Sequence, residues 1–166
     1  MCSSDLSEKN VAMLTSHGVF TPAELRSRYE IMLENYCKTV LIEANTMIDM
    51  AKRQILPAVA SYAAALSSDI AAKRAVSEPL SCRYEVRTAA ALSRIADSIA
   101  DRADELEEAA GEARGIGEIG AQSFSIRDKV LGRMTALRKL CDEAETLTAA
   151  DFWPFPTYGE LLFGVN

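Results

Sequence analysis

The side chains best suited to chemistry in this chain are acidic residues that recur at helical spacing between positions 97 and 112. They are Asp97, Asp101, Asp104, Glu108 and Glu112. Carboxylate oxygens of this kind bind divalent cations, but carboxylates on one surface helix seldom form a closed site. Because arginines are interspersed at positions 94, 102 and 114, the pattern indicates a solvated helix face.

Other motifs that could carry chemistry are weak. His17 is the single histidine, which excludes a multi-histidine zinc site, and its place before a glycine is typical of a helix end. The spacing Gly115-x-Gly117-x-x-Gly120 matches a dinucleotide-binding fingerprint, but that fingerprint needs a preceding strand and a helical pattern precedes it here. We expect no catalytic, cofactor-binding or metal-binding residue in this chain.

Two further carboxylates, Glu43 and Asp49, flank an apolar helical stripe. If they are buried, each must be paired or hydrogen-bonded, with the basic residues at positions 38, 52 and 53 or another helix as partners. Structural pairing is the favoured interpretation. The same helix carries methionines that we interpret as adaptable core or interface residues: Met32, Met47 and Met50.

The composition limits the domain count and the partners. With 166 residues, 49% of them hydrophobic, the chain suffices for one core, so a single helical domain over 1–166 is predicted. A net charge of -6 without a basic stripe argues against nucleic acid and acidic membrane surfaces. The longest charge-free run, 54–68, is too short and too rich in Ala and Ser for a bilayer span. The first residues lack the pattern of a secretory signal, so we expect a cytoplasmic location.

The four cysteines, Cys2, Cys37, Cys82 and Cys141, lie far apart in the sequence. This spacing fits neither a disulfide framework nor a metal-binding pair. Cys37 and Cys141 lie on or beside apolar helical stripes, which predicts buried free thiols.

Three long helices are predicted. The sequence Thr21-Pro22-Ala23-Glu24 is a capping box, and apolar residues then recur every three or four positions from Leu25 to Leu66. An unbroken helix there would be about 45 residues and roughly 68 Å long. Because Pro57 lacks a backbone donor, a kink is predicted near 54–56.

The second helix is predicted over 80–110 and the third from position 123 or 125 to 150, with a glycine-rich loop at 111–120 between them. A short helix over 6–16 should end at His17-Gly18, where glycine suits a C-cap. Since no window alternates strictly enough for a strand, the predicted fold is all-α. We expect an elongated antiparallel bundle over 21–150 after an N-terminal segment, 1–20.

The last part of the chain, 151–166, is predicted to be an extended aromatic tail. Prolines at 154 and 156 forbid a continuous helix, and five rings need a surface that covers them. These residues are the candidate interface: Phe152, Trp153, Phe155, Tyr158 and Phe163. The covering surface is either this chain's own bundle or a partner.

Several stretches together carry a family resemblance. They are RYEIMLENY at 28–36, IEANTMIDMAK at 42–52, QILPAV at 54–59, IRDKV at 126–130 and WPFPTYGELLF at 153–163. In this order they resemble the C-terminal region of type III glutamine synthetases and cover most of the chain. The resemblance implies a cytoplasmic, ring-shaped homo-oligomeric ligase of nitrogen metabolism that joins ammonia to glutamate with ATP and divalent metal ions, Mg or Mn.

Nothing in this chain matches the strand-rich catalytic portion of that family, so no catalytic or metal residue can be carried over. The resemblance implies an accessory domain that buttresses the catalytic portion of the synthetase or its subunit contacts and has no activity alone. The alternative is a free-standing helical scaffold or adaptor that binds another protein through its bundle face.

Overall fold

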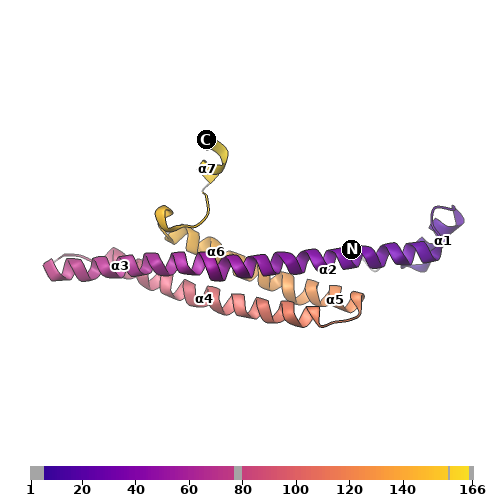
Figure 1. Ribbon diagram of the computed structural model, residues 1–166, viewed down its shortest axis with the longest axis horizontal. Helices are drawn as coiled ribbons and strands as arrows, with labels where there is room; N and C mark the ends of the chain where they lie inside the picture. The colour runs from indigo at the N-terminus through magenta and orange to yellow at the C-terminus, as the bar shows by residue number, and fades with distance from the viewer. Residues whose placement is uncertain (1–5, 77–79, 157, 165–166) are drawn as a thin grey trace.

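The computed structural model describes the chain apart from residues 1–5, 77–79, 157 and 165–166 (Figure 1). The described residues form helices and short connections, without a strand. The prediction of an all-helical fold is confirmed. The elements are α1 (Glu8–Ser16), α2 (Pro22–Met50), η2 (Ala51–Ile55), α3 (Leu56–Val76), α4 (Arg83–Arg114), α5 (Ile119–Ser125), η3 (Ile126–Val130), α6 (Leu131–Leu147), η4 (Ala150–Phe152) and α7 (Tyr158–Phe163).

Helices α2 and α3 form one continuous rod of 55 residues, Pro22–Val76, that runs nearly the full length of the molecule (Figure 1). Between them, η2 is a π-helical segment in which the Leu56 N–H bonds to the Ala51 carbonyl, five residues back. In an α-helix the Pro57 ring would clash with the carbonyl of Arg53, and the wider turn makes room for it. The effect of Pro57 is therefore a π-helical turn inside a rod that continues beyond it.

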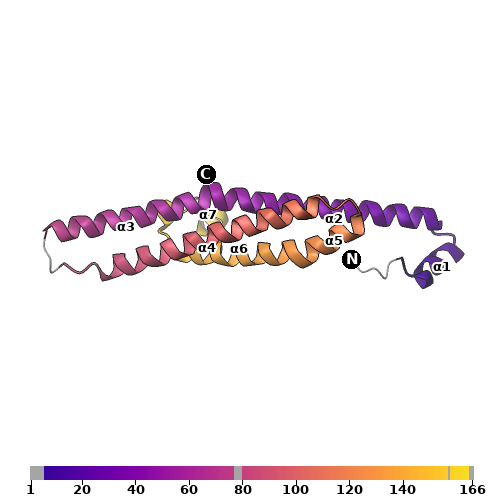
Figure 2. The same cartoon turned by 90° about the horizontal axis from the view of Figure 1, so that it is seen from below.

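Helix α4 returns along this rod, and α5, η3 and α6 run back again as a third helical stretch (Figure 2). Ion pairs fix α4 to both neighbours: Lys52 Nζ lies 2.7 Å from Asp104 and 2.6 Å from Glu107, and Lys129 Nζ lies 3.0 Å from Glu112. The most extensive packing joins α4 to α3 and to α6. Helix α4 is thus the central element against which the other two stretches pack.

The loop predicted over 111–120 is shorter than expected. Helix α4 continues through Arg114, because Ala110 and Ala113 are buried and hold the last turn in the core. Helix α5 begins at Ile119, where the Glu118 carboxylate accepts hydrogen bonds from the backbone N–H groups of Gly120 and Ala121. These two bonds, that to Ala121 first, lower the pKa of Glu118.

The core draws apolar residues from all three helical stretches. Its largest fully buried side chains are Leu92, Ile99, Leu106, Ile126, Leu137, Val59, Val130 and Cys37. Most of the predicted stripe positions are buried, but the N-terminal part of the first stripe is not. The first buried residue of α2 is Leu33, and α1 has none. The beginning of α2 therefore extends beyond the bundle with α1 at its end (Figures 1 and 2).

The ends of the first two helices follow the sequence signals. The Thr21 hydroxyl accepts from the Glu24 N–H at 3.3 Å, and the Glu24 carboxylate accepts from the Thr21 N–H at 2.8 Å. Helix α1 ends with Gly18 at φ 63°, where the N–H groups of Gly18 and Val19 bond to the carbonyls of Thr15 and Leu14. The capping box and the glycine C-cap are both confirmed.

We expect Thr21→Ala to destabilise the start of α2 by about 1 kcal/mol, because the substitution leaves the Glu24 N–H without its acceptor. Hydrogen exchange should show faster exchange of the Glu24 amide and lower protection in the first turns. Thr46→Ala is the control, since the Thr46 hydroxyl bonds only to the Ile42 carbonyl within the helix. Unchanged protection of the Glu24 amide in Thr21→Ala would contradict the prediction.

Among the described residues, one helix is long and apolar enough to cross a membrane by length and composition alone. It is Pro22–Val76, with a mean hydropathy of 1.4 over its most apolar window, of which 17% is buried. The expectation of no bilayer span rested on the charge-free run 54–68 alone, whereas this helix is apolar over a window that is not limited to that run. In the structure the same helix packs against α4 and holds Lys52 in two ion pairs.

Candidate functional site

The aromatic segment after α6 lies partly on the chain's own bundle. Phe152 lies in η4 with its ring centroid 5.2 Å from that of Tyr62 on α3. The rings of Trp153 and Phe155 meet edge to face at 6.1 Å, and both pack against the core. Three of the five candidate interface residues therefore contact this chain itself.

A cavity of about 290 Å³ is lined in part by Trp153 and Phe155. It is bounded by the second half of α2, by η2, by α6 and by the aromatic segment, with the lining residues Met47, Met50, Ile55, Leu137, Arg138, Cys141, Asp142, Glu145, Trp153 and Phe155. Arg138 and Asp142 form an i,i+4 pair at 3.5 Å. The cavity thus has an apolar floor and charged residues among its lining, a composition that suits an apolar side chain or a small amphipathic group.

Beyond Phe155 the chain leaves the bundle and forms α7, which stands apart from the three helical stretches (Figure 1). Leu161, Leu162 and Phe163 are 67%, 70% and 79% exposed. The prediction of a wholly extended tail is wrong here, because Pro156 prevents a helix from passing through it but does not prevent one from starting after it. Tyr158, the fifth candidate, has a side chain outside the described part of the structure.

Cys141 is the thiol in the cavity wall. Burial, reinforced by the Asp142 carboxylate, raises its pKa to about 11. Burial also raises the pKa of Cys37, which is 1% exposed in the core. Both thiols are free, as predicted, but only Cys37 is buried and Cys141 is half-buried; Cys2 lies outside the described residues. Because the thiolate is the nucleophilic form, Cys141 is not activated for catalysis.

We expect alkylation of Cys141 by iodoacetamide to accelerate about tenfold per pH unit from about pH 7 to about pH 9 without a plateau, because the thiolate fraction rises in that proportion below the pKa. Mass spectrometry of the peptide that contains Cys141 measures this rate. Cys37, deeper in the core, should react more slowly at every pH. A plateau below about pH 9 would contradict the raised pKa.

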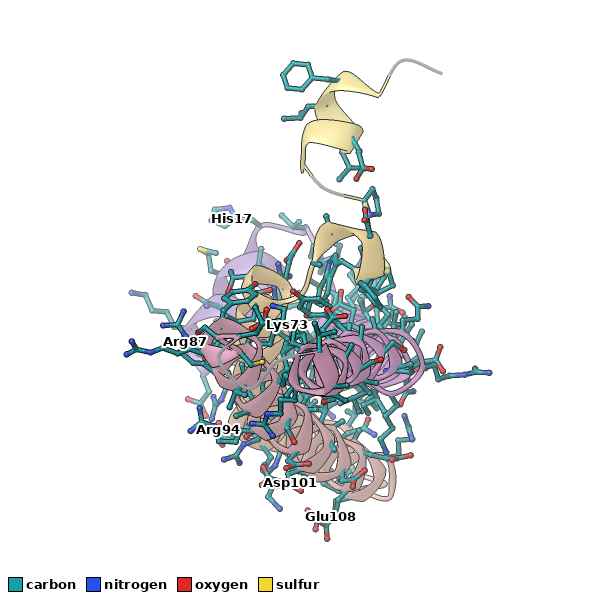
Figure 3. The ribbon with its side chains drawn as sticks, turned by 90° about the vertical axis from the view of Figure 1, so that its left-hand side faces the viewer. His17, Lys73, Arg87, Arg94, Asp101 and Glu108 are labelled. Carbon is teal, nitrogen blue, oxygen red and sulfur yellow. The ribbon has the colours of Figure 1, made fainter. Side chains whose placement is uncertain are left out.

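The other chemical candidates lie apart from this cavity. His17 caps the end of α1 and is exposed (Figure 3). The glycine fingerprint spans the turn between α4 and α5, so a helix and not a strand precedes it. Glu43 and Asp49 are both exposed, so the condition under which pairing would be required is not met. Asp49 nevertheless pairs with Arg53, one of the expected partners, at 3.1 Å.

The five candidate carboxylates of α4, at positions 97, 101, 104, 108 and 112, are also exposed, in line with a solvated face. Asp104 and Glu112 pair with lysines of neighbouring helices. Among the described residues, no group of three or more His, Cys, Asp or Glu side chains is arranged to hold a metal ion.

The sequence alone does not indicate which residues surround the aromatic segment. Tyr62 falls within the apolar repeat over 25–66, but nothing in that repeat indicates its contact with Phe152. Arg138 and Asp142 were not selected at all, although their i,i+4 spacing favours an ion pair on one helix face. Only the tertiary packing of α6 against α2 places that pair beside the aromatic segment.

Known proteins resemble this chain over almost its whole length. A glutamine synthetase from Butyrivibrio fibrisolvens is 33% identical over 97% of this chain and 23% of the relative. A type-3 glutamine synthetase from Dictyostelium discoideum is 26% identical over 95% of this chain and 22% of the relative. A glutamine synthetase from Bacteroides fragilis is 28% identical over 92% of this chain and 21% of the relative.

The family model for the glutamine synthetase C-terminal domain matches residues 2–74 of this chain. The chain spans about a fifth of the length of the curated relatives it matches. The resemblance seen in the sequence blocks is therefore confirmed. This chain is similar to the C-terminal region of glutamine synthetases, among them a type-3 enzyme.

Proposed function

We propose that this chain is an accessory structural domain of a type III glutamine synthetase, which supports the catalytic portion or the assembly of subunits. The observation that supports this proposal most directly is the exposed apolar surface on α7. Leu161, Leu162 and Phe163 are all more than half exposed, although the bundle beside them has a well-filled core. Apolar surface of this kind is typical of a segment that is covered in an assembly.

In this proposal the chain contributes no catalytic residue. Glutamate, ammonia, ATP and the Mg or Mn ions bind to the catalytic portion of the synthetase, in the cytoplasm. Support for this division comes from the chemistry of the described residues: burial raises the pKa of the cavity thiol, and Asp104 and Glu112 of α4 pair with lysines.

The test uses the relative from Butyrivibrio fibrisolvens, truncated to remove the part that matches this chain. We expect truncation to reduce ATP-dependent glutamine formation and to yield smaller assemblies, and fusion of this chain to restore both. The matched variant is a fusion in which Leu161, Leu162 and Phe163 are replaced by serine. Because these side chains are exposed, the variant should fold but fail to restore the assembly.

The proposal is wrong if the truncated relative assembles and works as well as the intact one. It is also wrong if the fusion folds, as judged by its helical circular dichroism, but restores neither size nor activity. That second result would favour the free-standing adaptor.

A further inference from the structure

The outward face of α4 carries four charged residues at seven-residue spacing: Arg87, Arg94, Asp101 and Glu108. Figure 3 shows them in this order along the outer side of the helix. All four are exposed. A heptad step drifts by only about 20° around an α-helix, so the four side chains form one narrow stripe, here called the α4 stripe. The buried residues Leu92, Ile99 and Leu106 lie on the opposite face.

The α4 stripe has no ion-pair partner among the residues that the structure describes, whereas charges beside it do. Asp104 and Glu112 pair with Lys52 and Lys129 from the neighbouring helices. Members of the stripe cannot pair with one another, because seven residues correspond to about 10.5 Å along the axis. The stripe is therefore a row of unpaired charges.

The signs along the stripe are segregated. The two arginines lie toward the N-terminal end of α4 and the two carboxylates toward its C-terminal end. All four residues lie between the first turn and the last turn of α4. Because the helix dipole acts mainly within those two turns, it has little effect on this order of signs.

The arrangement is self-complementary when a second copy lies antiparallel to the first. If the twofold axis passes between Asp97 and Ser98, Arg87 of one copy lies opposite Glu108 of the other, and Arg94 lies opposite Asp101. We propose that the α4 stripe is a twofold interface that binds a second copy of this chain in this register.

Alternative alignments are disfavoured by the same charges. A parallel pair in register brings arginine to arginine and carboxylate to carboxylate. A shift of the antiparallel pair by one heptad in one direction places Arg94 opposite the Arg94 of the other copy and leaves Glu108 unpaired. A shift in the other direction places Asp101 opposite Asp101 and leaves Arg87 unpaired. Only the antiparallel register about residues 97 and 98 makes all four contacts attractive, and such complementarity fixes register and partner choice.

The centre of the proposed interface permits close approach of the two helices. Ala90 and Ser98 lie near the stripe and are small, and Ala90 is exposed. Asp97 approaches its own copy near the twofold axis, which weakens the interface. Exposed charge pairs contribute little each, so the dimer should be weak, reversible and sensitive to salt. This inference does not rest on the proposed function.

The first measurement is sedimentation equilibrium of the 166-residue chain at up to about 0.5 mM protein. We expect a dimer in roughly 20 mM salt and a monomer in roughly 500 mM salt. Two charge-reversed variants follow. Arg87→Glu with Arg94→Glu makes the stripe wholly acidic, and Asp101→Lys with Glu108→Lys makes it wholly basic, so each should self-associate about 100-fold or more weakly.

Mixing the two reversed variants supplies the decisive readout. The acidic and basic stripes should form a heterodimer, and a variant with all four substitutions should again form a homodimer. The control, Arg26→Glu with Lys139→Glu, changes net charge equally at exposed positions off the stripe and should leave the dimer intact.

Three results would each overturn the proposal. One is a wild-type chain that stays monomeric in the low-salt buffer. Another is a dimer whose affinity does not respond to the reversed charges. The third is an equimolar mixture of the acidic and basic variants that remains monomeric.

Discussion

Leu106→Ala should lower the free energy of unfolding of this chain by about 2 to 5 kcal/mol. Leu106 is 0% exposed on α4, the helix that packs against both other helical stretches. Removal of its branched end therefore loses the transfer free energy of buried methyl groups and leaves a cavity in the packing between α4 and its neighbours.

Urea unfolding followed by circular dichroism at 222 nm measures this effect. The matched control is Ile42→Ala on α2, where the side chain is 65% exposed and alanine favours the helix, so stability should change by less than about 0.5 kcal/mol. Equal losses in the two variants would show that α4 does not occupy the centre of the core.

The elements that the sequence predicts well are those set by interactions within a few residues. Thr21 and Glu24 satisfy each other's backbone groups whatever the rest of the chain does, so the start of α2 was identified to the residue. Gly18 likewise ends α1, because its positive φ carries no steric cost for glycine. The apolar stripes of α4 and α6 are predictable for a related reason, since helical periodicity alone selects the buried face.

The features that could not be predicted depend on tertiary contact. Glycines at 111 and 115 suggested an early end to α4, but burial of Ala110 and Ala113 holds the helix together for another turn. Burial outweighs propensity where the two conflict. Periodicity also could not reveal that the first positions of the α2 stripe, such as Met32 at 54% exposure, extend beyond their neighbours in the bundle.

The candidate site was predictable in part. The aromatic composition after residue 150 identified a segment that needs a surface, and Trp153 and Phe155 do pack on the core. The position of the end of α6 relative to η2 decides which rings pack on this chain and which remain exposed. That position is set by tertiary packing and cannot be predicted from a local sequence pattern. The stripe of α4 shows the opposite case: its charges were visible, but their unpaired state needed the structure.

Ala103→Leu should destabilise the chain by about 1 to 3 kcal/mol, because added volume in a close-packed core forces side chains off their preferred rotamers. Ala103 is 0% exposed and lies beside Asp104, whose carboxylate pairs with Lys52 of η2. The ion pair indicates close approach of α4 to η2, so the larger side chain has to push these helices apart.

The matched control is Ala64→Leu on α3, an exposed position where leucine keeps nearly the same helix propensity and meets solvent. Thermal unfolding by calorimetry measures both variants, and only Ala103→Leu should lower the melting temperature.

A double variant, Ala103→Leu with Leu106→Ala, separates overpacking from other causes of destabilisation. Space vacated one helical turn away should accept part of the added leucine, so the two losses should sum to more than the double variant shows. Strict additivity would mean that the two positions do not share packing space.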